Sequence, residues 1–159
     1  MIWTPSPNFG ERTLPVTMLV LHYTGMKSGA EAIDWLANPA SKVSAHYVVD
    51  EDGQVVHMVR EEQRAQHAGL SHWRGITDCN SASIGIEIVN PGHEWGYRPF
   101  PEEQMAALVP LVAEIIGTYS IHPRNVVRAL RALGLREGHE MPVSRVGEGD
   151  KTPPPPAGA

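Results

Sequence analysis

The order of apolar and polar residues predicts several strands in the first ninety residues. An apolar, β-branched run over residues 16–22 is typical of a buried strand. Two further runs, 45–49 and 54–59, are separated by a turn with an Asp-Gly pair, which favours a hairpin. A fourth run, 84–89, stops at Asn-Pro-Gly and predicts another strand.

Helical periodicity is present in two segments, of which the shorter, residues 30–36, ends at Asn38-Pro39. Residues 101–119 predict a longer helix, with a proline and two glutamates suited to its first turn. Pro110 lies inside this helix and is expected to bend or shorten it. Its apolar stripe is expected at Met105, Leu108, Val109, Val112 and Ile116. Strands flanked by helices predict a mixed α/β domain, with a small central mixed sheet.

Length and composition are typical of one domain with an apolar core, since the chain has 159 residues and 42% of them are hydrophobic. No apolar run reaches the roughly 18–20 residues of a membrane span. The first residues lack the basic and apolar regions of a signal peptide, and the single cysteine, Cys79, can form no internal disulfide. We therefore expect a cytoplasmic protein, or a periplasmic or envelope protein if an N-terminal export segment has been lost.

Charge divides the chain into two parts. Residues 1–119 contain 7 Lys and Arg against 14 Asp and Glu, whereas residues 120–159 contain 6 against 4. The acidic body argues against nucleic acid as a partner, because such binding needs a basic surface. Residues 151–159 are rich in proline and predict a disordered tail.

His22 and Glu87 are the candidates for chemistry that the strand pattern indicates. His22 lies at the end of the first predicted strand, where a rigid scaffold can orient a metal ligand. Glu87 interrupts an apolar strand, and alternation places it on the face opposite the three isoleucines of that strand. Burial there would raise its pKa toward the range of a general base. The alternatives are a hydrogen-bonded histidine at the core edge and a paired structural glutamate.

The segment 65–75 is loop-like and contains His67, Trp73 and Arg74 among glycines. A tryptophan beside an arginine suits stacking on a sugar and binding of a carboxylate. Aromatic residues in a loop can equally cover the core, so both interpretations stay open.

Five motifs follow one another along the chain: Leu21-His22-Tyr23-Thr24, Val43-Ser44-Ala45-His46-Tyr47-Val48-Val49, Gln66-His67-Ala68-Gly69, Trp73-Arg74-Gly75 and Ser83-Ile84-Gly85-Ile86-Glu87-Ile88-Val89-Asn90. In this order they resemble type-2 N-acetylmuramoyl-L-alanine amidases, which share a zinc-amidase fold with peptidoglycan recognition proteins. The resemblance covers about residues 14–127 and extends through the long predicted helix to Ile121-His122-Pro123-Arg124-Asn125-Val126-Val127.

The resemblance implies one Zn²⁺ ion, bound by two histidines and an Asp or Cys, with a position left for water. By motif, His22 corresponds to the first zinc ligand and Glu87 to the glutamate that transfers the proton. His67, Trp73 and Arg74 would border the groove for the muropeptide. The implied reaction hydrolyses the amide between N-acetylmuramic acid and L-alanine, in peptidoglycan or in anhydro-muropeptide fragments.

The chain departs from the family after Val127. Members continue with Gly-His-Ser-Asp and a later lysine, but in ungapped register Ala129 replaces the second histidine and Glu137 replaces the lysine. His139 falls at the position of the third ligand. We therefore divide the chain into an amidase-like domain (14–127), a divergent segment (128–150) and the proline-rich tail.

Two explanations of the divergent segment are a slip of the reading frame in the gene and a weak zinc site built on His22 and His139. Loss of the lysine alone would cost about 10²–10³ in rate, by analogy with loss of an oxyanion donor. The functional alternatives are a zinc amidase, an impaired or inactive module that binds muropeptides, and a domain that folds poorly.

Overall fold

The computed structural model describes residues 1–129 and 143–145. His139 and the predicted proline-rich tail lie outside these residues. A seven-stranded sheet has the order β1-β5-β4-β7-β3-β8-β9, and β2 and β6 form a separate antiparallel ribbon. The strands are β1 Ile2–Trp3, β2 Phe9–Glu11, β3 Met18–Tyr23, β4 Tyr47–Val49, β5 Val55–His57, β6 Gln63–Ala65, β7 Ser83–Ile88, β8 Val126–Ala129 and β9 Val143–Arg145.

The sheet is mixed, as the sequence predicts. β3 pairs in parallel with β7 on one side and with β8 on the other, and β4 pairs in parallel with β7. β4 and β5 form the predicted antiparallel hairpin, in which Gly53 takes a φ of 83° that favours glycine. β3 and β7 are therefore the central strands, and both are almost wholly buried.

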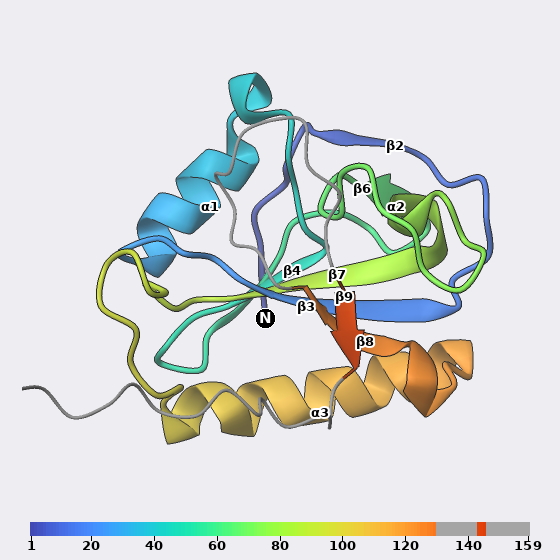
Figure 1. Cartoon of the computed structure of the whole chain (residues 1–159). Coiled ribbons are helices and arrows are strands. Elements are labelled where there is room, and N and C mark those ends of the chain that lie inside the picture. Colours follow the sequence, from blue (N-terminus) through green and yellow to red (C-terminus); the bar gives the residue numbers. More distant parts are fainter. Residues whose placement is uncertain (130–142, 146–159) are drawn as a thin grey trace, which may run out of the picture.

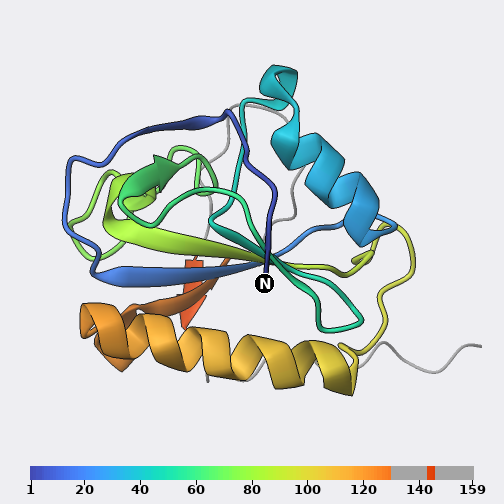
Figure 2. The same ribbon diagram turned by 180° about the vertical axis from the view of Figure 1, so that it is seen from behind.

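Helices cover both faces of the sheet. α3 (Glu102–Tyr119) runs along one face, while α1 (Gly29–Ala37), α2 (Cys79–Ala82) and the β2–β6 ribbon lie over the other (Figures 1 and 2). The short 3₁₀ helices Pro39–Ser41 and Pro123–Asn125 complete the described helical segments. No described helix has the length and apolar character that crossing a membrane requires.

The face under α3 forms the main apolar core. Residues of alternate positions in β7 and one side of α3 pack there, which buries aliphatic surface on both elements. The alternation predicted for β7 is confirmed, because its isoleucines all belong to this core. The members from these two elements are Ile84, Ile86, Ile88, Leu108, Leu111 and Ile115.

The predictions about α3 are right in part. Pro110 lies inside the 18-residue helix and does not shorten it. Of the predicted stripe, Leu108 is buried and Val112 and Ile116 pack against the core, whereas Met105 and Val109 are exposed. The fully buried positions are Gln104, Leu108, Leu111 and Ile115.

Gln104 is the polar member of this buried set. Its side-chain amide donates hydrogen bonds to the carbonyl oxygens of Val49, in β4, and Val89, directly after β7. A polar residue with two buried acceptors can therefore replace an apolar one in the stripe.

Candidate active site

His22 and Glu87 are direct neighbours across the two central strands. The parallel register of β3 and β7 pairs them, on the face opposite α3. The Nδ1 atom of His22 lies 4.0 Å from Oε1 of Glu87, and the two side chains are only 2% and 1% exposed. Two residues that are 65 positions apart in the sequence therefore form one buried pair.

Burial controls the protonation of this pair. It lowers the pKa of His22 to about 4, and it raises the pKa of Glu87 well above its usual range. Neither carboxyl oxygen of Glu87 has a hydrogen-bond partner among the described residues. A carboxyl group with a raised pKa and both oxygens free is suited to exchange a proton with a bound reactant.

His67 is joined to this pair by its ring. Its Nδ1 atom lies 3.0 Å from Nε2 of His22, and the side chain is buried. The ring lies flat against β7 at Gly85, where an added Cβ atom would come within 2.4 Å of the His67 ring. Only glycine leaves this space. The structure therefore brings His67 to the His22–Glu87 pair, as a buried neighbour of His22.

Trp73 and Arg74 lie in a tight turn that closes with paired backbone hydrogen bonds between Trp73 and Ile76. The indole Nε1 of Trp73 donates a 3.3 Å hydrogen bond to Asn125, whose amide donates in turn to the Thr17 carbonyl. Thr17 precedes β3, about 16 Å along the strand from His22. Arg74 is exposed. These two residues therefore lie toward the other end of β3 from the His22–Glu87 pair.

The sequence analysis assigned no role to His46, which is fully buried at the start of β4. Its Nδ1 accepts a hydrogen bond of 3.0 Å from the backbone N–H of Gly85, and its ring lies 5.9 Å from that of His67. Burial lowers its pKa to about 3. His46 belongs to the motif at residues 43–49. Its position in a run of apolar and β-branched residues did not predict that its ring would lie near the other histidines.

Ala129 lies on the other side of His22. β8 pairs with β3 so that Leu21 faces Arg128, and the next pair in this register is His22 with Ala129. Ala129 is 1% exposed and packs in the same apolar cluster as Val20, which places it on the face of His22. The position that the resemblance gives to the second histidine ligand therefore holds a methyl group.

The described residues do not form a zinc site by themselves. Within 1–129 and 143–145, no three His, Cys, Asp or Glu side chains are grouped so that they could hold a metal ion. His22 and Glu87 supply donors, whereas Ala129 cannot.

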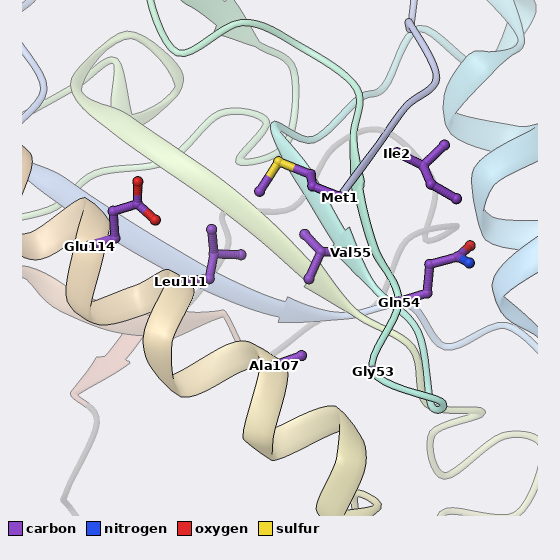
Figure 3. Close-up of a pocket in the computed structure, with 8 residues that line it drawn as sticks. All are labelled: Met1, Ile2, Gly53, Gln54, Val55, Ala107, Leu111 and Glu114. Atoms are coloured by element: carbon purple, nitrogen blue, oxygen red, sulfur yellow. The ribbon is translucent and has the colours of Figure 1, made fainter.

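A groove on the other face is separate from this site. It has a volume of about 380 Å³ and lies between α3 and the β1–β5 edge, where Val55 and Leu111 face each other (Figure 3). Because Leu111 and Val55 pack with the core on the α3 side, the groove and the His22–Glu87 pair are on opposite faces of the sheet.

The chain is thus a mixed α/β domain whose two central strands carry a buried histidine–glutamate pair. The chain belongs to the N-acetylmuramoyl-L-alanine amidase family, whose sequence profile matches residues 12–156. This range continues past Val127 and includes His139.

Individual relatives support the assignment. The chain is 38% identical over 125 residues to N-acetylmuramoyl-L-alanine amidase AmiD of Escherichia coli, which covers 70% of the chain and 44% of AmiD. It is 28% identical over 133 residues to 1,6-anhydro-N-acetylmuramyl-L-alanine amidase AmpD of Haemophilus influenzae, covering 72% and 70%.

A solved complex of Escherichia coli AmiD with anhydro-N-acetylmuramic acid-L-Ala-D-gamma-Glu-L-Lys has the same fold. The TM-score is 0.63 at 34% sequence identity, with 79% of this chain and 49% of that chain covered. The chain thus spans less than half the length of AmiD.

Proposed function

We propose that this chain hydrolyses the amide bond between N-acetylmuramic acid and L-alanine in muropeptides. The observation that carries the proposal is the buried His22–Glu87 pair, in which a carboxyl group with two unpartnered oxygens lies beside a neutral imidazole. Such a group has no structural partner among the described residues, so its retention in an apolar strand favours a catalytic role.

Glu87 is the proposed proton carrier. As a carboxylate it takes a proton from the attacking water, whose oxygen bonds to the amide carbon. It then delivers that proton to the nitrogen of alanine as the carbon–nitrogen bond breaks. Its raised pKa suits both halves of this cycle, because a more basic carboxylate accepts the first proton more readily.

The proposed substrate is an anhydro-muropeptide or a peptidoglycan fragment. Support comes from the AmiD complex, whose ligand is an anhydro-N-acetylmuramic acid tripeptide. Arg74 and Trp73 lie toward the other end of β3 from the His22–Glu87 pair, so they would contact the distal part of the ligand. The exposed Arg74 would pair there with a carboxylate of the stem peptide, and the half-buried Trp73 would offer an aromatic edge. Recycled fragments in the cytoplasm are the proposed source, with wall fragments in the envelope as the alternative.

Zinc is proposed as the cofactor because the family is generally zinc-dependent. His22 and His139 are the proposed ligands, since the family match includes His139. Zinc content of the purified chain should be measured before and after His139→Ala. A reduced content is expected, and an unchanged content would exclude His139 as a ligand.

The test of the main proposal is release of the stem peptide. The purified chain is incubated with an anhydro-muramyl tripeptide, with and without added Zn²⁺, and free peptide is quantified by chromatography. Glu87→Gln is the matched control, because it keeps the shape of the side chain and removes the carboxylate. Release by the original chain that this variant lacks is expected. Equal release by both would contradict the assignment of Glu87.

A second candidate function rests on Ala129. Because the position beside His22 holds no donor, the chain could bind muropeptides without hydrolysing them. Calorimetric titration with the same tripeptide separates the two, since binding without peptide release would favour the binding module.

A further inference from the structure

A chain of hydrogen bonds connects the end of α2 to His22 and begins at Ser83. The Ser83 Oγ atom lies 2.5 Å from the carbonyl oxygen of Cys79, one helical turn earlier. Two oxygens at this distance need a hydrogen between them, and the carbonyl has none to give. The single hydroxyl hydrogen of Ser83 therefore points at Cys79.

The second link is His67. Its Nε2 atom lies 3.1 Å from Ser83 Oγ, which can only accept because its hydrogen is already used. The hydrogen of the neutral imidazole must therefore sit on Nε2, and Nδ1 of His67 must carry the lone pair. The position of the ring is held by Asn80, whose side-chain oxygen accepts from the backbone N–H of His67 and of Ala68.

The third link is His22. Its Nε2 atom is 3.0 Å from His67 Nδ1, which now requires a donor. A neutral His22 meets this requirement only as the tautomer with its hydrogen on Nε2. Its other nitrogen, Nδ1, is then bare, and this is the atom that faces the carboxyl group of Glu87 at 4.0 Å.

We propose that Ser83 and His67 are positioning residues, which hold His22 in the Nε2–H tautomer and keep its Nδ1 lone pair directed into the site beside Glu87. The use of that lone pair rests on the proposed function, whereas the tautomer itself does not. Ser83 and His67 lie behind His22 in the chain of hydrogen bonds, so they act through His22.

The arrangement assigns a physical reason to three features of the sequence. Gly85 leaves room for the His67 ring, Asn80 holds its backbone, and Ser83 determines the position of its hydrogen. With the opposite tautomer, His22 would present an N–H group toward Glu87 and could not accept a proton or coordinate an ion there.

The test is nitrogen NMR of the full chain at neutral pH, without added metal or substrate. Long-range ¹H–¹⁵N spectra of ¹⁵N-labelled protein distinguish the protonated from the bare nitrogen of each histidine, and single substitutions assign His22 and His67. We expect both rings as Nε2–H tautomers. A wild-type His22 with its hydrogen on Nδ1 would overturn the proposal, whatever the variants of Ser83 show.

Two variants of Ser83 test whether its hydroxyl group sets the tautomers of His67 and His22. Ser83→Ala removes the acceptor for His67, and the second tautomer of His67 and of His22 should increase about fivefold or more, as expected for the loss of one hydrogen bond. Ser83→Thr keeps the hydroxyl group and should retain the wild-type pattern. An unchanged His22 tautomer in Ser83→Ala would contradict the role of Ser83.

His67→Phe tests whether His67 determines the tautomer of His22. It keeps a flat ring against Gly85 but removes both nitrogens, so His22 should show a mixture of tautomers. A His22 that stays wholly Nε2–H in this variant would contradict the role of His67. Because none of these spectra depends on turnover, failure of the amidase assay would leave the tautomer result unaffected.

Discussion

The two flanks of His22 on the sheet differ in the side chains that they present. For the proposed site, we call the β7 side the complete flank and the β8 side the incomplete flank. On the β7 side, Glu87 is buried next to His22, and the hydrogen bonds from Ser83 through His67 hold the ring of His22. On the β8 side, the neighbour is Ala129, which supplies neither a donor nor a charge. Under the proposed function, the β7 flank carries the group that transfers the proton, whereas the β8 flank offers no side chain that could bind an ion.

The largest expected effect tests the complete flank. Glu87→Gln should lower the rate of peptide release about 10²–10⁴-fold, because it removes the group that transfers the proton. The same variant should unfold at an equal or higher temperature at neutral pH, since it no longer buries an ionisable group without partners among the described residues. Loss of both activity and stability would instead indicate a structural glutamate.

Low pH should reduce the free energy of unfolding, because His22 is buried in its neutral form. Its pKa is about 4 in the folded protein and about 6.5 in an unfolded chain, so protons bind more tightly to the unfolded chain. The contribution of His22 to the free energy of unfolding is therefore complete above about pH 6.5, and it falls by about 3 kcal/mol as the pH drops toward 4.

The raised pKa of Glu87 gives this residue the opposite effect on stability as the pH falls. The effect of His22 is therefore measured in proteins that lack the Glu87 carboxyl group. Urea unfolding of Glu87→Gln, with and without His22→Asn, should be followed across this pH range. The variant that retains His22 should lose more stability toward acid. Parallel pH curves for the two proteins would disprove the linkage.

A smaller effect is expected at the incomplete flank. Ala129→His places an imidazole beside His22 and should raise the affinity for Zn²⁺ about tenfold or more, by analogy with the gain from a well-placed ligand shell. It should also cost about 1–3 kcal/mol of stability, because the site is fully packed. Ala129→Asn is the control, because it also enlarges the side chain but adds no imidazole. Equal zinc affinity in both variants would show that a donor here cannot reach the ion.

The smallest effect concerns Arg74, away from both flanks. Arg74→Ala should weaken muropeptide binding about tenfold, as expected for one charge-assisted contact, with no change in unfolding temperature because the side chain is exposed. Arg74→Lys keeps the charge and should lose less. Calorimetric titration measures both, and unchanged binding in Arg74→Ala would remove this residue from the proposed groove.

Much of the local structure could be predicted from the sequence. The apolar run at 16–22 contains most of β3, the Asp-Gly turn joins β4 to β5, and alternation in β7 correctly placed Glu87 on the face away from its isoleucines. The stripe of α3 was predicted in part: Leu108, Val112 and Ile116 pack in the core, but buried Gln104 was missed because its hydrogen bonds go to two carbonyl oxygens outside the helix.

The sequence by itself determined the main strands, the two longer helices, the family, and His22 and Glu87 as candidate residues, because each is encoded in periodicity or in a contiguous motif. Only the tertiary structure decided which side chains meet. His67 reaches His22 because the loop before α2 folds its ring onto Gly85, and Ala129 reaches His22 because β8 pairs in parallel with β3. Such contacts join residues more than forty positions apart, and they depend on strand order and register, which no local pattern of the chain contains.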